Sequence, residues 1–110
     1  MPEEFVKIVV FAPIDSADVI RKVIGDQEAG VIGNYSHASF SSRGVGRFIP
    51  QNGSNPAIGT FGKLEEVEEE RIEVICAKSK AKKVVGAIKK VHPYEEPAIE
   101  IYLLISAGNL

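Results

Sequence analysis

The chain has 110 residues, 45% of them hydrophobic and 25% charged, and its formal net charge at pH 7 is −2. This length predicts one domain with a buried core, and the slightly acidic balance lacks the basic face that a nucleic-acid partner usually requires. One cysteine excludes an internal disulfide, no apolar run approaches the roughly 20 residues of a membrane span, and the acidic N-terminus does not resemble a signal peptide. We therefore expect a cytoplasmic protein with no membrane contact.

The first half of the chain predicts a strand, a helix and a second strand. Residues 5–12 are rich in β-branched side chains, which is typical of a buried strand. Asp15 and Ser16 offer a helix cap, and apolar residues at helical spacing predict an amphipathic helix over 16–28. Residues 34–50 are polar and alternate weakly, which favours a strand over a helix.

The second half predicts a loop and then a strand, a helix and a last strand. Residues 51–56 have the composition of a loop, and we expect 58–64 to re-enter the sheet. The acidic run at 65–70 is expected to be a solvated ribbon, whereas 71–77 alternates well enough to be a strand with Ile72, Val74 and Cys76 facing inward. Ser79 is predicted to cap a helix with an apolar stripe over 81–91. In the last strand, four apolar residues share one face: Ile99, Ile101, Leu103 and Ile105.

This order of elements predicts an α+β fold in a single domain over 1–110. The architecture is a ferredoxin-like βαββαβ sandwich, a four-stranded antiparallel sheet with two helices on one face. A parallel sheet is the less favoured alternative, because the connection between the second and third strands contains no helix. Four apolar side chains are expected on the uncovered face of the sheet: Phe5, Val9, Phe11 and Tyr102. So much apolar surface on an uncovered face indicates self-association.

The run His92-Pro93-Tyr94-Glu95-Glu96-Pro97 gathers a histidine, two carboxylates and an aromatic ring between the second helix and the last strand. His92, Glu95 and Glu96 are candidate ligands for a divalent metal, with His37 or Cys76 completing the shell. The alternative interpretation is a helix-to-strand corner in which the prolines fix the turn and His92 lies at the negative end of the helix. We favour the corner.

Four other residues are weighed for chemistry. His37 lies in a serine-rich segment and is a candidate ligand or interface residue, although a surface position is the plainer interpretation. Cys76 alternates with buried positions and is expected to be an inert thiol. Arg43 and Arg47, separated by glycines, could grip an anionic ligand or a partner's carboxylates, or could form only an exposed bend. The sequence displays no catalytic centre.

Six segments together resemble the insert domain of YqfO-type proteins of the Nif-three-like family, which are often labelled homologues of GTP cyclohydrolase 1 type 2. These segments are Gly30–His37, Phe40–Ser42, Gly46–Phe48, Gly53–Pro56, Gly62–Glu65 and His92–Ala98. The closing His-Pro-Tyr-Glu-Glu-Pro also resembles the end of CutA, a trimeric protein linked to divalent-cation tolerance. Both resemblances imply a ferredoxin-like fold similar to that of the PII signalling proteins.

In full-length YqfO-type proteins, a two-metal site is built by the domains that flank this insert, and those domains are not part of this sequence. The resemblance therefore transfers neither that site nor a hydrolase activity, and it implies a stand-alone insert domain that oligomerises. We do not expect the chain to be an enzyme.

Three functional hypotheses follow. The first is a ligand-binding or regulatory module that forms a homotrimer and binds a small molecule or a protein partner at the subunit boundary, with five candidate residues there: His37, Arg43, Arg47, Tyr94 and Tyr102. The second is a divalent-cation binder that uses His92, Glu95 and Glu96, and no other cofactor is expected. The third, less favoured, is a GTP cyclohydrolase-type hydrolase, which needs a water-activating centre.

Overall fold

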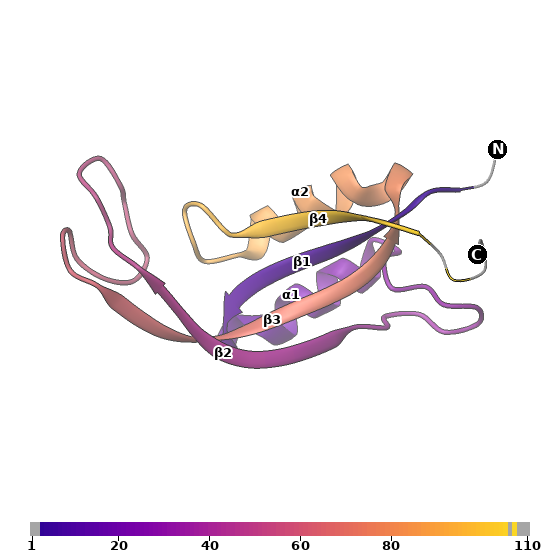
Figure 1. Ribbon diagram of the computed structural model, residues 1–110, viewed down its shortest axis with the longest axis horizontal. Helices are drawn as coiled ribbons and strands as arrows, with labels where there is room; N and C mark the ends of the chain where they lie inside the picture. The colour runs from indigo at the N-terminus through magenta and orange to yellow at the C-terminus, as the bar shows by residue number, and fades with distance from the viewer. Residues whose placement is uncertain (1–2, 106, 108–110) are drawn as a thin grey trace.

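The computed structural model describes residues 3–105 and 107. Its elements follow the order β1 (Phe5–Pro13), α1 (Ile14–Asp26), β2 (Phe40–Phe48), β3 (Glu65–Ala77), a short 3-10 turn η1 (Lys78–Lys80), α2 (Ala81–Val91) and β4 (Ile99–Leu104) (Figure 1). This order confirms the predicted βαββαβ arrangement. No helix in the described part of the chain is long and apolar enough to cross a membrane.

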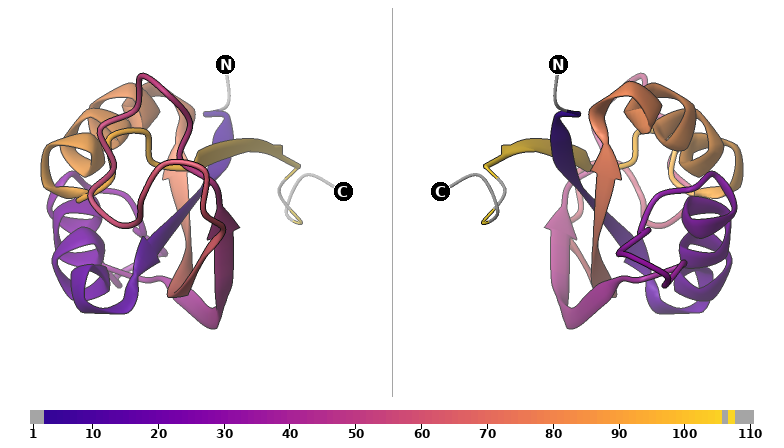
Figure 2. Two further views of the ribbon diagram at one scale, coloured as in Figure 1. Left: turned by 90° about the vertical axis from the view of Figure 1, so that its left-hand side faces the viewer. Right: turned by 90° about the vertical axis from the view of Figure 1, so that its right-hand side faces the viewer.

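The four strands form one antiparallel sheet in the order β2-β3-β1-β4. The central strand β1 pairs with both β3 and β4, so that Phe5 lies opposite Ala77 on one side and opposite Leu104 on the other. Both helices lie on the same face of the sheet, and β4 extends away from them at its edge (Figure 2). The antiparallel pairing excludes the parallel alternative.

The core lies between the sheet and the two helices. Alternate residues of β1 and β3 point into it, and they pack against the apolar stripes of both helices. The fully buried large side chains on this side include Ile8 and Ile72 from the sheet, Ile20 and Ile24 from α1, and Ile88 from α2. The inward alternation predicted for the strand after the acidic run is therefore confirmed.

The uncovered face carries the four apolar side chains expected there, but it also carries charges. The strand registers place Phe5, Val9, Phe11 and Tyr102 on this face. Between them lies a charged row in which Glu73 pairs with Lys7 at 4.0 Å and with Arg71 at 3.5 Å. The face is thus mixed rather than uniformly apolar.

The β2–β3 ribbon differs most from the sequence-based expectation. The acidic run at 65–70 belongs to β3, which is 13 residues long, and residues 58–64 form bends and turns instead of a strand. Gly59 and Gly62 have φ values of 96° and 76°, which break an extended chain. The connection between the two strands projects from the body at the left of Figure 1.

The helix caps also differ from the prediction. Helix α1 begins two residues earlier than expected, after Pro13, and neither Asp15 nor Ser16 caps it; Asp15 lies in the first turn, where its charge suits the helix dipole. Ser79 does not cap α2, and its hydroxyl donates to Glu3 instead at 2.9 Å. The last strand ends at Leu104, so Ile105 lies just beyond it.

Candidate functional site

The corner between α2 and β4 is fixed by the ring of His92, which is only 7% exposed. Its Nε2 lies 2.8 Å from the carbonyl oxygen of Phe11, and its Nδ1 lies 3.1 Å from the backbone nitrogen of Tyr94. A carbonyl can only accept and an amide N–H can only donate, so Nε2 carries the proton and Nδ1 is the acceptor. His92 is therefore a neutral imidazole that ties the corner to the central strand.

This geometry does not fit His92 as a metal ligand, because neither ring nitrogen offers a free lone pair. Glu95 accepts a hydrogen bond from the backbone N–H of Asn55 at 2.9 Å, and Glu96 is exposed. Over residues 3–105 and 107, no three His, Cys, Asp or Glu side chains come close enough to hold a metal ion. The three predicted ligands share the corner but form no preorganised site.

Tyr94 joins this corner to the β2–β3 ribbon. Its hydroxyl donates to Glu69 Oε2 at 2.8 Å, and its ring meets the ring of Phe48 edge-on at 6.0 Å between centroids. Gly46 makes the first contact possible, because a Cβ there would lie 1.9 Å from Glu69 Oε1. The absent side chain at Gly46 thus leaves the room in which the Glu69 carboxylate lies along the neighbouring strand.

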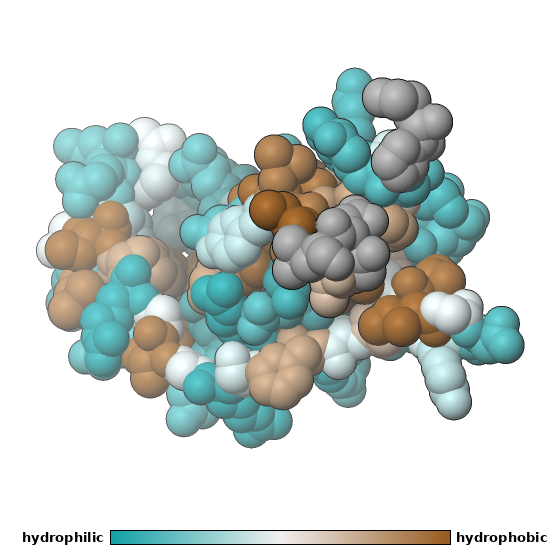
Figure 3. Space-filling view, turned by 45° about the vertical axis from the view of Figure 1, so that its right-hand side comes forward, coloured by the Kyte–Doolittle hydropathy of each residue, from teal (hydrophilic) through white to brown (hydrophobic). Residues whose placement is uncertain are grey.

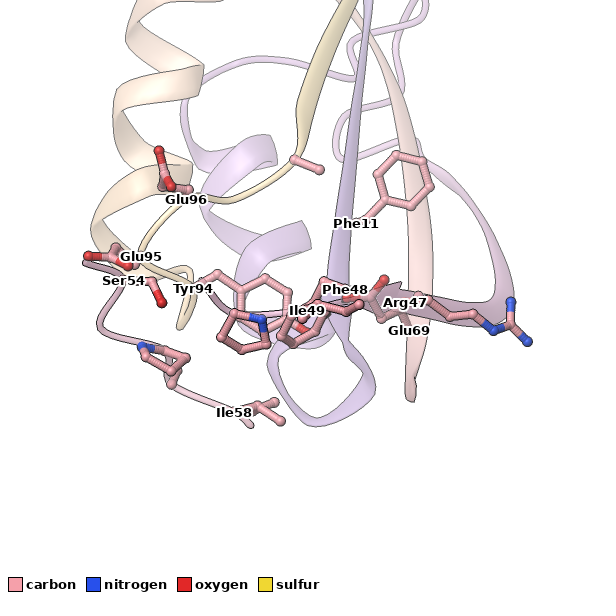
Figure 4. A pocket seen from close by; sticks show the side chains of 15 residues that line it. Phe11, Arg47, Phe48, Ile49, Ser54, Ile58, Glu69, Tyr94, Glu95 and Glu96 are labelled. Atoms are coloured by element: carbon pink, nitrogen blue, oxygen red, sulfur yellow. Dashed lines mark hydrogen bonds between the residues drawn. The ribbon is translucent and has the colours of Figure 1, made fainter. Parts of the chain in front are cut away.

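These residues border a cavity of about 370 Å³ (Figure 4). Its walls come from β1, β2, β3, the loop between β2 and β3 (residues 49–64) and the corner between α2 and β4 (residues 92–98). The lining residues labelled in Figure 4 include Phe11, Arg47, Phe48, Ile49, Glu69, Tyr94, Glu95 and Glu96. A second hollow of about 310 Å³ adjoins it and shares Phe11, Gly46 and Glu69. The first volume is typical of the smaller ligand sites in proteins, which span about 300–1,000 Å³.

The partly buried hydroxyl of Tyr94 predicts a loss of stability in alkali. Burial, followed by the hydrogen bond to Glu69 and the charge of that carboxylate, raises the pKa of Tyr94 far above its ordinary value near 10. The folded state then holds a proton that the unfolded chain releases, so this contribution is complete below pH 10 and is lost as the pH rises above it. In urea unfolding between pH 8 and 11, we expect the wild type to lose more stability than Tyr94→Phe. Parallel pH profiles would contradict this.

The structure brings four of the eight predicted site residues to the cavity: Arg47, Tyr94, Glu95 and Glu96. Arg43 borders the adjoining hollow, and the guanidinium of Arg47 pairs with Glu66 at 3.3 Å. Tyr102 lies on the uncovered face, where its hydroxyl donates to Glu100 at 2.8 Å.

His92 fixes the corner without lining the cavity, and His37 lies away from it, as does Cys76, the alternative metal ligand. His37 packs over Gly25 of α1, where a Cβ would meet the ring at 2.1 Å, and its Nε2 lies 3.0 Å from Asp26 Oδ1. Hydrogen bonds from Lys22 and then from His37 lower the pKa of Asp26. Cys76 is 2% exposed in the core, and burial raises the pKa of its thiol, as expected for an inert cysteine.

Sequence reasoning missed Glu69, the most deeply placed polar residue of the cavity, which is 8% exposed. It lay within an acidic run that was expected to be solvated throughout. The sequence does contain one indication of this residue. Gly44 and Gly46 alternate in β2, and glycines within a strand mark positions where another group approaches closely.

Comparison with known proteins identifies relatives that are much longer than this chain; no family model matches it. The GTP cyclohydrolase 1 type 2 homolog of Halalkalibacterium halodurans is 48% identical over 107 residues, which are 97% of this chain and 29% of the relative. That of Bacillus subtilis is 46% identical over 96 residues, which are 87% of this chain and 26% of the relative. The chain thus spans between a quarter and a third of these curated relatives.

Solved structures agree with the sequence matches. A Bacillus cereus protein related to NIF3 superposes with a TM-score of 0.83 at 49% identity, covering 94% of this chain and 26% of that one. The CutA protein of Archaeoglobus fulgidus, a periplasmic divalent cation tolerance protein by name, gives a TM-score of 0.71 at 19% identity, covering 94% of this chain and 86% of that one. The second match shows the fold alone. This chain is homologous to the insert region of the NIF3-related GTP cyclohydrolase 1 type 2 homologs and has a CutA-like, ferredoxin-like fold.

Proposed function

We propose that this chain is a non-enzymatic, self-associating module that binds a small ligand at the boundary between copies, and that the assembly is a homotrimer. The activity named for the longer relatives is not transferred, because the chain spans only 29% and 26% of the two relatives compared above. The chemistry of the cavity supports binding: apolar and aromatic walls surround a small number of polar groups.

The observation that carries self-association is the exposed edge strand β4. Within the described residues it pairs only with β1, so no described strand lies beside its outer backbone groups. Ile101, Tyr102 and Leu103 are 47%, 43% and 71% exposed, although they are consecutive large side chains in a strand. Figure 3 shows hydrophobic side chains on this side of the molecule, interrupted by hydrophilic ones. An apolar edge of this kind favours pairing with another chain.

The cavity lies close to this edge. Ala98, the residue before β4, borders the cavity, and its carbonyl accepts the backbone N–H of Phe11 at 3.2 Å. A copy that packs against β4 would therefore cover surface next to the cavity mouth. This proximity supports the proposal that ligand binding and assembly share one boundary.

The test places a charge at the edge strand. We expect the wild type to sediment as a trimer at micromolar concentration, and Leu103→Lys to sediment as a monomer because a buried lysine at the boundary has no partner. Val19→Lys is the matched control, since Val19 is 48% exposed on α1 and the charge change is the same. A wild type that stays monomeric, or a Leu103→Lys trimer, would refute the proposal.

A divalent-cation role, as in the name of the CutA protein compared above, would require a different arrangement of His92. His92 would have to release the backbone N–H of Tyr94 before Nδ1 could bind a metal. Calorimetric titration with copper, zinc and nickel separates the two functions. We expect no heat that depends on His92, and binding that disappears in His92→Gln would favour the cation binder.

A further inference from the structure

We propose that the cavity beside Tyr94 binds a small organic cation, a protonated amine on an aromatic or other apolar body, with Glu69 as its counter-ion. The inference rests on the proposed function in one respect only: it names the ligand class of the same cavity. The two claims have separate readouts, because amine binding and sedimentation are measured independently.

Glu69 is the buried acid of the cavity. Its side chain is 8% exposed and borders both hollows, so its carboxylate faces them at the place where they join. Its hydrogen-bond partner is the neutral hydroxyl of Tyr94. A buried carboxylate is costly without a positive charge nearby, and a hydroxyl supplies a hydrogen bond but no charge.

Two basic residues near Glu69 pair with other carboxylates. Arg71, two positions along the same face of β3, pairs with Glu73 and lies over the Phe11 ring at 5.4 Å from its centroid. Arg47 pairs with Glu66, and Figure 4 shows its guanidinium turned away from the cavity. Among the described residues, no Lys, Arg or His nitrogen lies within 4.0 Å of the Glu69 carboxylate. The Glu69 carboxylate is thus available to a cationic ligand.

The side chains that line the cavity determine which body of the ligand fits beside the amine. Phe11, Phe48 and Tyr94 place three aromatic rings around the cavity, and aromatic faces attract both apolar groups and cations. Glu95 and Glu96 add negative charge at the lining, which disfavours an anion. A phosphate, a nucleotide or a carboxylate therefore does not suit this cavity, whereas an arylalkylamine meets each wall with a matching group.

The test uses three probes of nearly equal size: 2-phenylethylamine, the neutral 2-phenylethanol and the anionic phenylacetate. Titrations are followed by the amide NMR shifts of residues that border the cavity. We expect the amine to bind at least about tenfold more tightly than the alcohol, and phenylacetate not to bind, because only the amine gives Glu69 a charged hydrogen-bond donor. Equal affinity for the amine and the alcohol would overturn the proposal.

Glu69→Gln is the decisive variant, since its side-chain oxygen can still accept the Tyr94 hydroxyl and the fold is retained. We expect it to weaken amine binding at least about tenfold and to leave 2-phenylethanol unchanged. Glu68→Gln, an exposed neighbour on β3 with the same change in charge, should bind the amine like the wild type. Equal weakening of amine binding in both variants would show that only the net charge of the protein matters, and would overturn the assignment of Glu69 as the counter-ion.

The assembled state is the second control. Amine binding by both the wild type and the Leu103→Lys variant supports the proposal whether or not the protein self-associates. Binding by Leu103→Lys alone would overturn it, because a second copy would then occupy the cavity in the wild type.

Discussion

Replacing Gly30 by alanine is expected to lower the free energy of unfolding by about 3 kcal/mol. Gly30 has a φ of +74°, which a side chain disfavours, and a Cβ there would lie 2.4 Å from the carbonyl oxygen of Ala38. The backbone cannot move aside easily, because the Gly30 N–H donates to Ile75 at 2.7 Å and its carbonyl accepts from Ala38 at 2.9 Å. The substitution therefore strains the segment that extends the edge of β3.

Gly33→Ala provides the matched control for this prediction. Gly33 also has a positive φ, +56°, but no atom of the described residues lies within 4 Å of a Cβ built there. It should lose only the conformational cost, about 1 kcal/mol. Chemical denaturation of both variants measures the difference, and equal losses would show that the contact with Ala38 relaxes freely.

His92→Ala is expected to cost about 3 kcal/mol, because it opens a cavity and leaves two backbone groups without their partner. The groups are the carbonyl of Phe11 and the N–H of Tyr94. Loss of the second bond also frees Tyr94, whose ring and hydroxyl border the cavity. We therefore expect His92→Ala to weaken binding of 2-phenylethylamine as well, although His92 itself does not border the cavity.

The other histidine supplies the control. His37 has a side chain that is 48% exposed, and its contact with Asp26 is open to solvent. His37→Ala should cost less than about 1 kcal/mol and leave amine binding unchanged. Urea denaturation and the NMR titration can be run on both variants, and similar stabilities for the two would contradict a structural role for the His92 ring.

Alternation of side chains predicted the sheet faces well, because burial acts directly on every second residue of a strand. Val9 and Phe11 were assigned to the uncovered face, and Ile72 and Val74 to the core, from the pattern alone. Element order then followed from the spacing of the apolar residues, and it was enough for the fold class.

The acidic strand could not be predicted, because three of its carboxylates find partners in other elements of the fold. Glu66 pairs with Arg47 of β2, Glu70 with Arg21 of α1, and Glu69 accepts from Tyr94 at the far corner. From the sequence alone, the neighbouring carboxylates of this run are expected to repel one another. In the folded chain, three of them have a partner each. Tertiary contacts thus override a weak strand propensity.

The candidate site was predicted only in part, because its residues meet through tertiary contacts between several elements. The run at 92–97 was recognised as the place where polar groups gather, and Tyr94, Glu95 and Glu96 do border the cavity. The role of His92 followed from partners on other elements, namely a carbonyl of β1 and an amide two residues ahead. Tautomer and ligand competence depend on those partners, so they are properties of the folded corner and not of its composition.

The pairing of Phe5 with Leu104 has a topological consequence. The first and last strands run side by side in opposite directions, so the polypeptide enters and leaves this fold about 5 Å apart, one strand spacing. A longer protein can therefore carry such a unit between two of its own neighbouring residues, with little entropy lost in closing the surrounding loop. In the two longer relatives compared above, the matching region is 29% and 26% of the length. Adjacent ends allow a region of this kind to lie within a longer chain.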